Sequence, residues 1–201
     1  MKMEKDYLEH IKDYNIRQAW PIPEKTALLV IDMQQYFRGL VGPILDNVIS
    51  LINVCRASGV KIFFTRHGHR DPKKDGGMLL RWWADLIHYG SGEWELVREL
   101  KVTTKEAILD KNRYSAFFGT DLDERLQVEG AEDLVICGVM TNCCCETTAR
   151  DAFVRDYRVF FVADATATAN EELHLASLKN LAYGFAYIVN TKHICQRFTY
   201  S

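Results

Sequence analysis

The sequence predicts a three-layer α/β/α fold, with a central, mostly parallel sheet of about six strands between layers of helices. Apolar runs of strand length alternate with amphipathic helical stretches along most of the chain. Strands that are apolar throughout are typical of parallel sheets covered on both faces. The 201 residues contain no internal repeat and no low-complexity linker. We therefore expect a single domain over residues 1–201, with residues 1–22 as an N-terminal helical extension.

The elements follow from hydrophobic spacing and from the residues that end each run. The segment 43–58 repeats apolar residues at helical spacing and stops at Gly59, and the segment 121–128 ends before Gly130. Residues 66–92, rich in His, Gly and Trp, are expected to be irregular. The expected strands are 27–31, 60–65, 107–109, 134–139, 159–162 and 186–189. The expected helices are 4–18, 43–58, 93–100, 121–128, 171–183, and one that begins near residue 141 and ends near residue 156.

Composition and charge exclude several classes of function. The formal net charge of −2 gives no bias toward nucleic acid or anionic membranes. No apolar run approaches the ~20 residues that span a bilayer, and residues 1–10 are too charged for a signal peptide. The six cysteines, three of them consecutive at 143–145, form neither a secreted disulfide pattern nor a C-x-x-C zinc pair. The sequence therefore predicts free thiols and a cytoplasmic location.

Reactive residues follow the predicted strands at their carboxyl ends. Asp32, His67, Lys111 and the segment 140–144 all lie at or just beyond such an end. Ligands of parallel α/β sheets bind outside the carboxyl ends of the strands. We therefore expect these residues to line one site.

Three of these residues suit nucleophilic catalysis. Cys144 lies at the start of a helix capped by Thr141 or Asn142, where exposed N–H groups favour a thiolate and could hold an oxyanion. Asp32 could take the thiol proton and pass it to a leaving amine. Lys111 would favour the charged form of both. Each residue alone also has an ordinary explanation: helix packing for the cysteine, loop capping for the aspartate and solvation for the lysine.

Together these segments resemble the isochorismatase-like cysteine hydrolases, which include nicotinamidases and N-carbamoylsarcosine amidases. The matching segments are 30–34 with Phe37 following, 111–117, and 138–144 with its continuation to 152. The resemblance covers roughly residues 24–190. It implies that Asp32, Lys111 and Cys144 are catalytic. It also implies a cis peptide bond before Met140 and an oxyanion hole formed by the backbone N–H groups of Met140 and Cys144.

The resemblance implies hydrolysis of a C–N bond in a small amide, carbamoyl or ureido compound through a thioester. Family members that cleave isochorismate lack the cysteine, so we disfavour that reaction. Phe37, His67 and Trp83 are the predicted substrate contacts. The loop tryptophans Trp82, Trp83 and Trp94 could wall a small planar substrate or form the interface of a dimer or tetramer. Candidates for binding a substrate carboxylate are Arg66, Arg70, Arg81 and Arg113.

Two alternatives to a metal-free cysteine amidohydrolase stay open. A metal-assisted nicotinamidase would use His67 and His69, with His88 displaced by two positions from the place where such enzymes carry a further histidine. We expect that no cofactor is required, since both imidazoles could bind loop backbone instead. The second alternative is a non-catalytic, oligomeric family member. A flavodoxin-like binding module is disfavoured because no glycine-rich phosphate loop follows the first strand.

Overall fold

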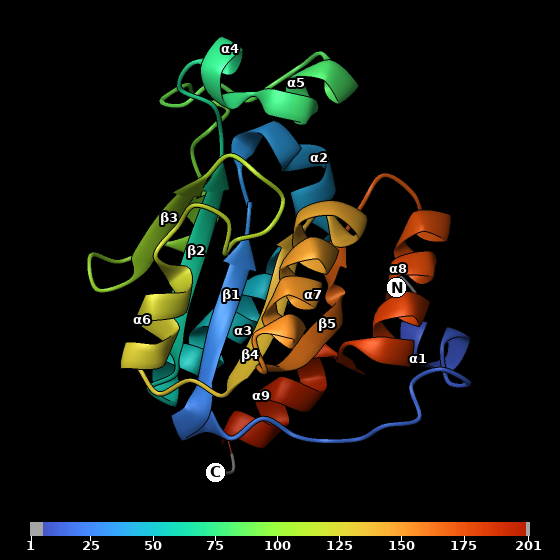
Figure 1. Ribbon diagram of the computed structural model, residues 1–201. Helices are drawn as coiled ribbons and strands as arrows, with labels where there is room; N and C mark the ends of the chain where they lie inside the picture. Colours follow the sequence, from blue (N-terminus) through green and yellow to red (C-terminus); the bar gives the residue numbers. More distant parts are fainter. Residues whose placement is uncertain (1–5, 200–201) are drawn as a thin grey trace.

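Six parallel strands form the centre of the computed structural model, which describes residues 6–199 (Figure 1). The strands are β1 Thr26–Ile31, β2 Lys61–His67, β3 Ala107–Lys111, β4 Asp133–Val139, β5 Arg158–Ala167 and β6 Tyr187–Val189. Their order is β3-β2-β1-β4-β5-β6, and each neighbouring pair is parallel. The chain builds outward from β1 on one side and from β4 on the other. The point where the direction reverses, between β1 and β4, is where such sheets bind ligands.

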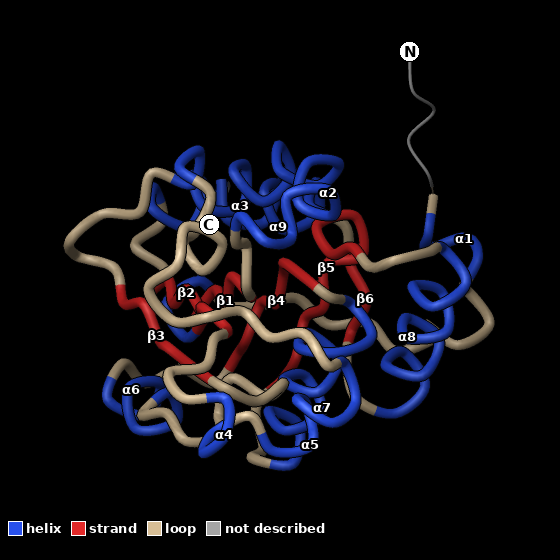
Figure 2. The backbone as a smooth tube through the Cα atoms, turned by 90° about the horizontal axis from the view of Figure 1, so that it is seen from above, coloured by secondary structure: helices blue, strands red, loops and turns tan. Residues whose placement is uncertain are grey.

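Helices cover both faces of the sheet, which confirms the predicted three-layer fold (Figure 2). The α-helices are α1 Tyr7–His10, α2 Arg38–Val41, α3 Leu45–Ala57, α4 Pro72–Asp75, α5 Gly77–Trp83, α6 Leu122–Val128, α7 Glu146–Val154, α8 Glu171–Gly184 and α9 Thr191–Thr199. The side chains of α3 and α9 share a core with one face. Those of α6, α7 and α8 share a core with the other.

The burial of β1 explains its unbroken apolar sequence. Leu28 and Val30 belong to the core under α3 and α9, whereas Leu29 and Ile31 belong to the core under α6, α7 and α8. Successive side chains of a strand point to opposite faces, so a strand covered on both faces must be apolar at every position. β1 is therefore rigidly held, and so is the residue that follows it.

One helical run, Gln35–Ala57, is long and apolar enough to cross a membrane by length and composition. This goes beyond the sequence-based expectation that apolar runs are only of strand length. The core helix of a soluble protein passes the same test. Within this run, Val48, Leu51 and Cys55 of α3 pack into the core against the sheet. The run is therefore explained by its place in the fold.

Several predicted elements differ from those observed. The N-terminal helix expected over 4–18 is reduced to α1, and residues 4 and 5 lie outside the described part of the chain. The segment 66–92 contains α4 and α5, whereas the helix expected at 93–100 is only a 3-10 turn at its end. Helices α2 and α9 were not predicted. The remaining strands and helices are found within a few residues of the expected bounds, although β5 continues five residues further.

Candidate active site

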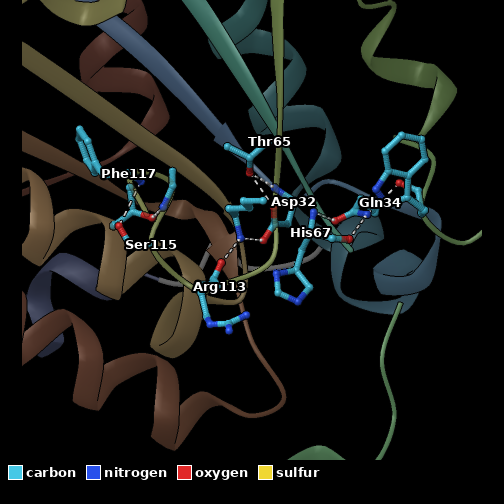
Figure 3. A network of polar contacts seen from close by, with 11 residues as sticks. Asp32, Gln34, Thr65, His67, Arg113, Ser115 and Phe117 are labelled. Atoms are coloured by element: carbon cyan, nitrogen blue, oxygen red, sulfur yellow. Dashed lines mark hydrogen bonds and ion pairs between the residues drawn. The ribbon is translucent and has the colours of Figure 1, made fainter. Parts of the chain in front are cut away.

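Asp32 is fixed directly after β1 by two neighbouring strands (Figure 3). The Thr65 hydroxyl on β2 donates to its Oδ1 at 2.6 Å and accepts the Asp32 backbone N–H at 3.1 Å. Lys111 Nζ, at the end of β3, donates to Oδ2 at 2.7 Å. The Asp32 backbone has a φ of 47°, in the left-handed region that non-glycine residues rarely adopt. Such local strain persists where the surrounding structure holds it, often at functional sites.

Lys111 forms a fully buried ion pair with Asp32. Neither side chain is exposed, and Lys111 Nζ also donates to the Arg113 carbonyl at 3.1 Å. Burial alone would lower the pKa of Lys111, but the Asp32 carboxylate outweighs it and raises the pKa above its ordinary value. The ammonium group therefore stays charged at neutral pH.

Cys144 lies in a π-helical turn, Thr141–Cys145, between β4 and α7. The Met140 carbonyl accepts the backbone N–H groups of Cys143 and Cys145, both at 3.1 Å, which ties this turn to the end of β4. The expected side-chain cap is absent from the turn. Instead, Thr141 Oγ1 lies 2.9 Å from His174 Nδ1, and Asn142 accepts from Thr168 at 2.6 Å. A ligand atom of each of Asp32, His67 and Cys144 lies within 4.8 Å of the others.

The free thiol, and not the thiolate, is the resting form of Cys144. Burial raises its pKa well above the ordinary range, and this outweighs the attraction of Lys111. The Asp32 carboxylate raises it further. Burial thus opposes the thiolate that we expected the helix end to stabilise. A carboxylate within reach can accept the proton when the sulfur attacks.

Gly138 is required by the close approach of β1 and β4. Its φ is 115°, and a Cβ at this position would lie 2.0 Å from the Ile31 carbonyl oxygen. Neither the conformation nor the space permits another residue. The cis peptide bond implied by the resemblance is present between Val139 and Met140.

A cavity of about 280 Å³ opens onto Cys144. Its walls are mainly aromatic and aliphatic, and the full lining is Tyr36, Phe37, His67, Leu79, Trp83, Asp85, Leu86, Ile87, Tyr114, Met140, Cys143 and Cys144. All three predicted substrate contacts, Phe37, His67 and Trp83, lie in this lining. The contribution of Tyr36, Asp85 and Tyr114 was missed. Tyr114 lies in the matching segment 111–117 and Tyr36 precedes Phe37, so motif position was the available signal for both, whereas nothing in the sequence around Asp85 distinguishes a pocket wall from a surface loop.

The four candidate arginines do not line the cavity. Arg66 pairs with Asp110 at 2.9 Å and stacks on buried Trp94, and Arg70 stacks on Tyr89. The Arg113 guanidinium donates to the Asp75 carbonyl at 2.7 Å, and Arg81 is exposed on α5. Trp94, which we also expected to line the pocket, instead lies under the Arg66 guanidinium and is not among the lining residues. The charged residue among the lining residues is instead acidic: it is Asp85, whose carboxylate accepts a hydrogen bond from the Tyr36 hydroxyl at 2.8 Å.

The donor set around His67 does not fit a dedicated metal site. Among residues 6–199, the group of three potential ligands found together is Asp32, His67 and Cys144. Both Asp32 oxygens already bind Lys111 and Thr65, and the buried ammonium would repel a cation. The Nδ1 of His69 lies 3.2 Å from the Asp75 carboxylate, and His69 belongs to no such group.

Gln34 holds the pocket wall in place, a role that the sequence did not reveal. Its buried amide donates to the carbonyls of His67 and Trp94 at 2.9 and 2.8 Å, and accepts the His67 backbone N–H at 2.8 Å (Figure 3). The residue lies within the 30–34 segment, so its position in that motif was the available signal. The His67 backbone is therefore fixed independently of its ring.

The fold and this residue set define a class: α/β enzymes with an aspartate, a lysine and a cysteine at the carboxyl edge of a parallel sheet. The isochorismatase domain family matches residues 26–193. The chain belongs to this family and is an isochorismatase-like hydrolase.

Known relatives span most of the chain. It is 49% identical to nicotinamidase 3 of Arabidopsis thaliana over 89% of this chain and 91% of that protein. It is 27% identical to a ureidoacrylate amidohydrolase of Acinetobacter baylyi, over 89% of this chain and 86% of that protein. Among solved structures, a cysteine hydrolase of Pseudomonas syringae pv. phaseolicola superposes with a TM-score of 0.87 at 28% identity, covering 90% and 96% of the two chains.

Proposed function

We propose that this protein hydrolyses the C–N bond of a small, uncharged carboxamide by nucleophilic catalysis at Cys144. The observation that carries the proposal is the buried set of Asp32, Lys111 and Cys144 at the end of a cavity. A thiol beside a carboxylate that can accept its proton is the arrangement needed for an attack on an amide carbonyl.

The proposed reaction has two halves. The Cys144 thiol gives its proton to Asp32 as the sulfur attacks the carbonyl carbon, and the backbone N–H groups of Met140 and Cys144 hold the oxyanion. Asp32 then protonates the leaving nitrogen, the C–N bond breaks, and a thioester and ammonia or an amine result. Water attacks the thioester, gives a proton to Asp32, and the proton returns to sulfur as the C–S bond breaks. Lys111 stabilises the carboxylate throughout.

The charge of the cavity supports an uncharged substrate. No lysine or arginine is among its lining residues, whereas Asp85 is. Carbamoyl and ureido acids carry a carboxylate that would need a cationic partner. The aromatic walls and the volume of about 280 Å³ suit a small planar ring. Nicotinamide is the first compound to test, because a nicotinamidase is 49% identical to this chain.

We propose that the reaction needs no bound metal. The support is the donor set: Asp32 already binds Lys111, and among the described residues His69 belongs to no group of three potential ligands. Protein treated with a chelator and dialysed is expected to keep its activity. A loss that added zinc or iron restores would contradict this.

The deciding test compares ammonia release by the wild type, Cys144→Ala and Cys195→Ala. The panel contains nicotinamide, simple amides, and carbamoyl and ureido acids. We expect the wild type to act on an uncharged amide, and Cys144→Ala to lose at least ~10³-fold in kcat. Cys195 on α9 is a matched thiol outside the cavity. Wild-type activity in Cys144→Ala would refute the mechanism, and a wild type inactive on the whole panel would favour a non-catalytic family member.

We also propose that the protein is a cytoplasmic homo-oligomer. All six cysteines are free thiols, as suits a reducing compartment. Trp82 on α5 is 76% exposed, and exposed tryptophans are enriched at protein interfaces. Light scattering of the purified protein tests the oligomer, and a monomer at micromolar concentration would contradict it.

A further inference from the structure

We propose that the His67 ring accepts a hydrogen bond from the substrate's carboxamide nitrogen and thereby orients the leaving group toward Asp32. The inference rests on the proposed amide hydrolysis and assigns His67 a role in the chemical step. The ring lines the cavity and is 8% exposed.

The position of the ring suits this contact. One ring nitrogen lies within 4.8 Å of both an Asp32 carboxylate oxygen and the Cys144 sulfur. An amide nitrogen whose carbon is in contact with the sulfur must lie close to Asp32 in order to receive its proton. Because the ring nitrogen and the carboxylate oxygen are no more than 4.8 Å apart, a nitrogen bound beside both can lie about 3 Å from each.

The ring also has unused hydrogen-bonding capacity. Among the described residues, His67 Nδ1 is buried and has no hydrogen-bond partner. Buried polar atoms of side chains nearly always have a hydrogen-bond partner, so a donor on the substrate would satisfy this nitrogen. Burial, together with the Lys111 charge, lowers the pKa of His67 to about 3. The ring is therefore neutral near pH 7 and keeps one nitrogen as an acceptor.

An N–H acceptor at this place has a specific consequence for the reaction. A primary carboxamide has two N–H bonds and, once the carbonyl is tetrahedral, a nitrogen lone pair. When His67 holds one N–H, the lone pair can face the protonated Asp32. The interaction is strongest where proton transfer occurs, so it acts on the rate of C–N cleavage. An ester has no N–H and cannot make this contact.

The matched pair nicotinamide and methyl nicotinate separates this role from general packing. Both are uncharged and carry the same ring, but they lose ammonia and methanol respectively. In His67→Leu we expect kcat/KM for the amide to fall roughly tenfold or more, and for the ester less than about threefold. The side chain can be replaced without breaking the Gln34 bonds, because these involve the His67 backbone.

A second variant, His67→Asn, keeps an acceptor near the Nδ1 position. We expect it to recover much of the amide activity relative to His67→Leu. Equal losses for amide and ester in His67→Leu, or no loss for either, would overturn the proposal. A wild type that cleaves the ester but no amide would also overturn it. If the wild type cleaves neither compound nor any other amide, it is the proposed function that fails, a result distinct from the first three.

Discussion

Replacing Lys111 by methionine is expected to destabilise the fold and abolish activity. The change removes the ammonium from a 2.7 Å ion pair in which neither side chain is exposed, and leaves the Asp32 carboxylate buried without its partner. Breaking a buried pair from one side costs about 3–5 kcal/mol. With a urea slope of about 2–3 kcal/mol/M, the midpoint of unfolding should fall by about 1–2.5 M.

The assay is equilibrium urea unfolding followed by circular dichroism, with two comparisons. Lys105→Met, at an exposed lysine before β3, should stay within about 0.5 kcal/mol of the wild type. The double variant Lys111→Met with Asp32→Asn removes both charges and should regain much of the lost stability while remaining inactive. A single variant within 1 kcal/mol of the wild type, or a double variant no more stable than the single, would refute the reasoning.

Three further predictions concern the strand crossing, the cavity and the nucleophile. Gly138→Ala should lower the free energy of unfolding by about 3 kcal/mol or more, because the new Cβ would overlap the Ile31 carbonyl oxygen. Thermal unfolding measures this loss, and an unchanged melting temperature would show that β4 can shift. Asp85→Asn should raise kcat/KM for a ureido acid about threefold and change kcat/KM for nicotinamide less, because it removes a negative charge at the cavity. The gain for the ureido acid should shrink in high salt. An equal change for both substrates would argue against a charge effect. Iodoacetamide should alkylate Cys144 at a rate that still rises above pH 9, because its pKa is raised and thiolate is scarce below that pH. A plateau near neutral pH, measured against Cys144→Ala as background, would contradict the raised pKa.

The strand scaffold was predictable because burial on both faces leaves a plain signature. After their first residues, Thr26 and Asp133, β1 and β4 carry no polar side chain, and the ends of these two strands locate Asp32 and Cys144. The joint position of Asp32, Lys111 and Cys144 follows from parallel topology alone.

Other features could not be predicted because they depend on contacts distant in sequence. Whether Arg66 binds a ligand or stacks on Trp94 is decided by tertiary packing, and so is the acidic side chain at the cavity. The protonation of Cys144 also depends on burial, which outweighs the helix end that the sequence suggested. Short helices such as α4 and α5 lack the length over which periodicity can be recognised.

The connection between β2 and β3 supplies one wall of the cavity and none of the three proposed catalytic residues. Leu79, Trp83, Asp85, Leu86 and Ile87 all belong to this one connection, whereas the reacting groups follow the strands themselves. An exchange of this segment between relatives would therefore replace one wall of the cavity and leave Asp32, Lys111 and Cys144 unchanged, whereas Phe37 and Tyr114 would stay as they are. Gln34 joins this connection to the end of β1, because its amide donates to the carbonyls of His67, at the end of β2, and of Trp94. Changes confined to this one stretch of the gene could therefore reshape part of the cavity without altering Asp32, Lys111 or Cys144.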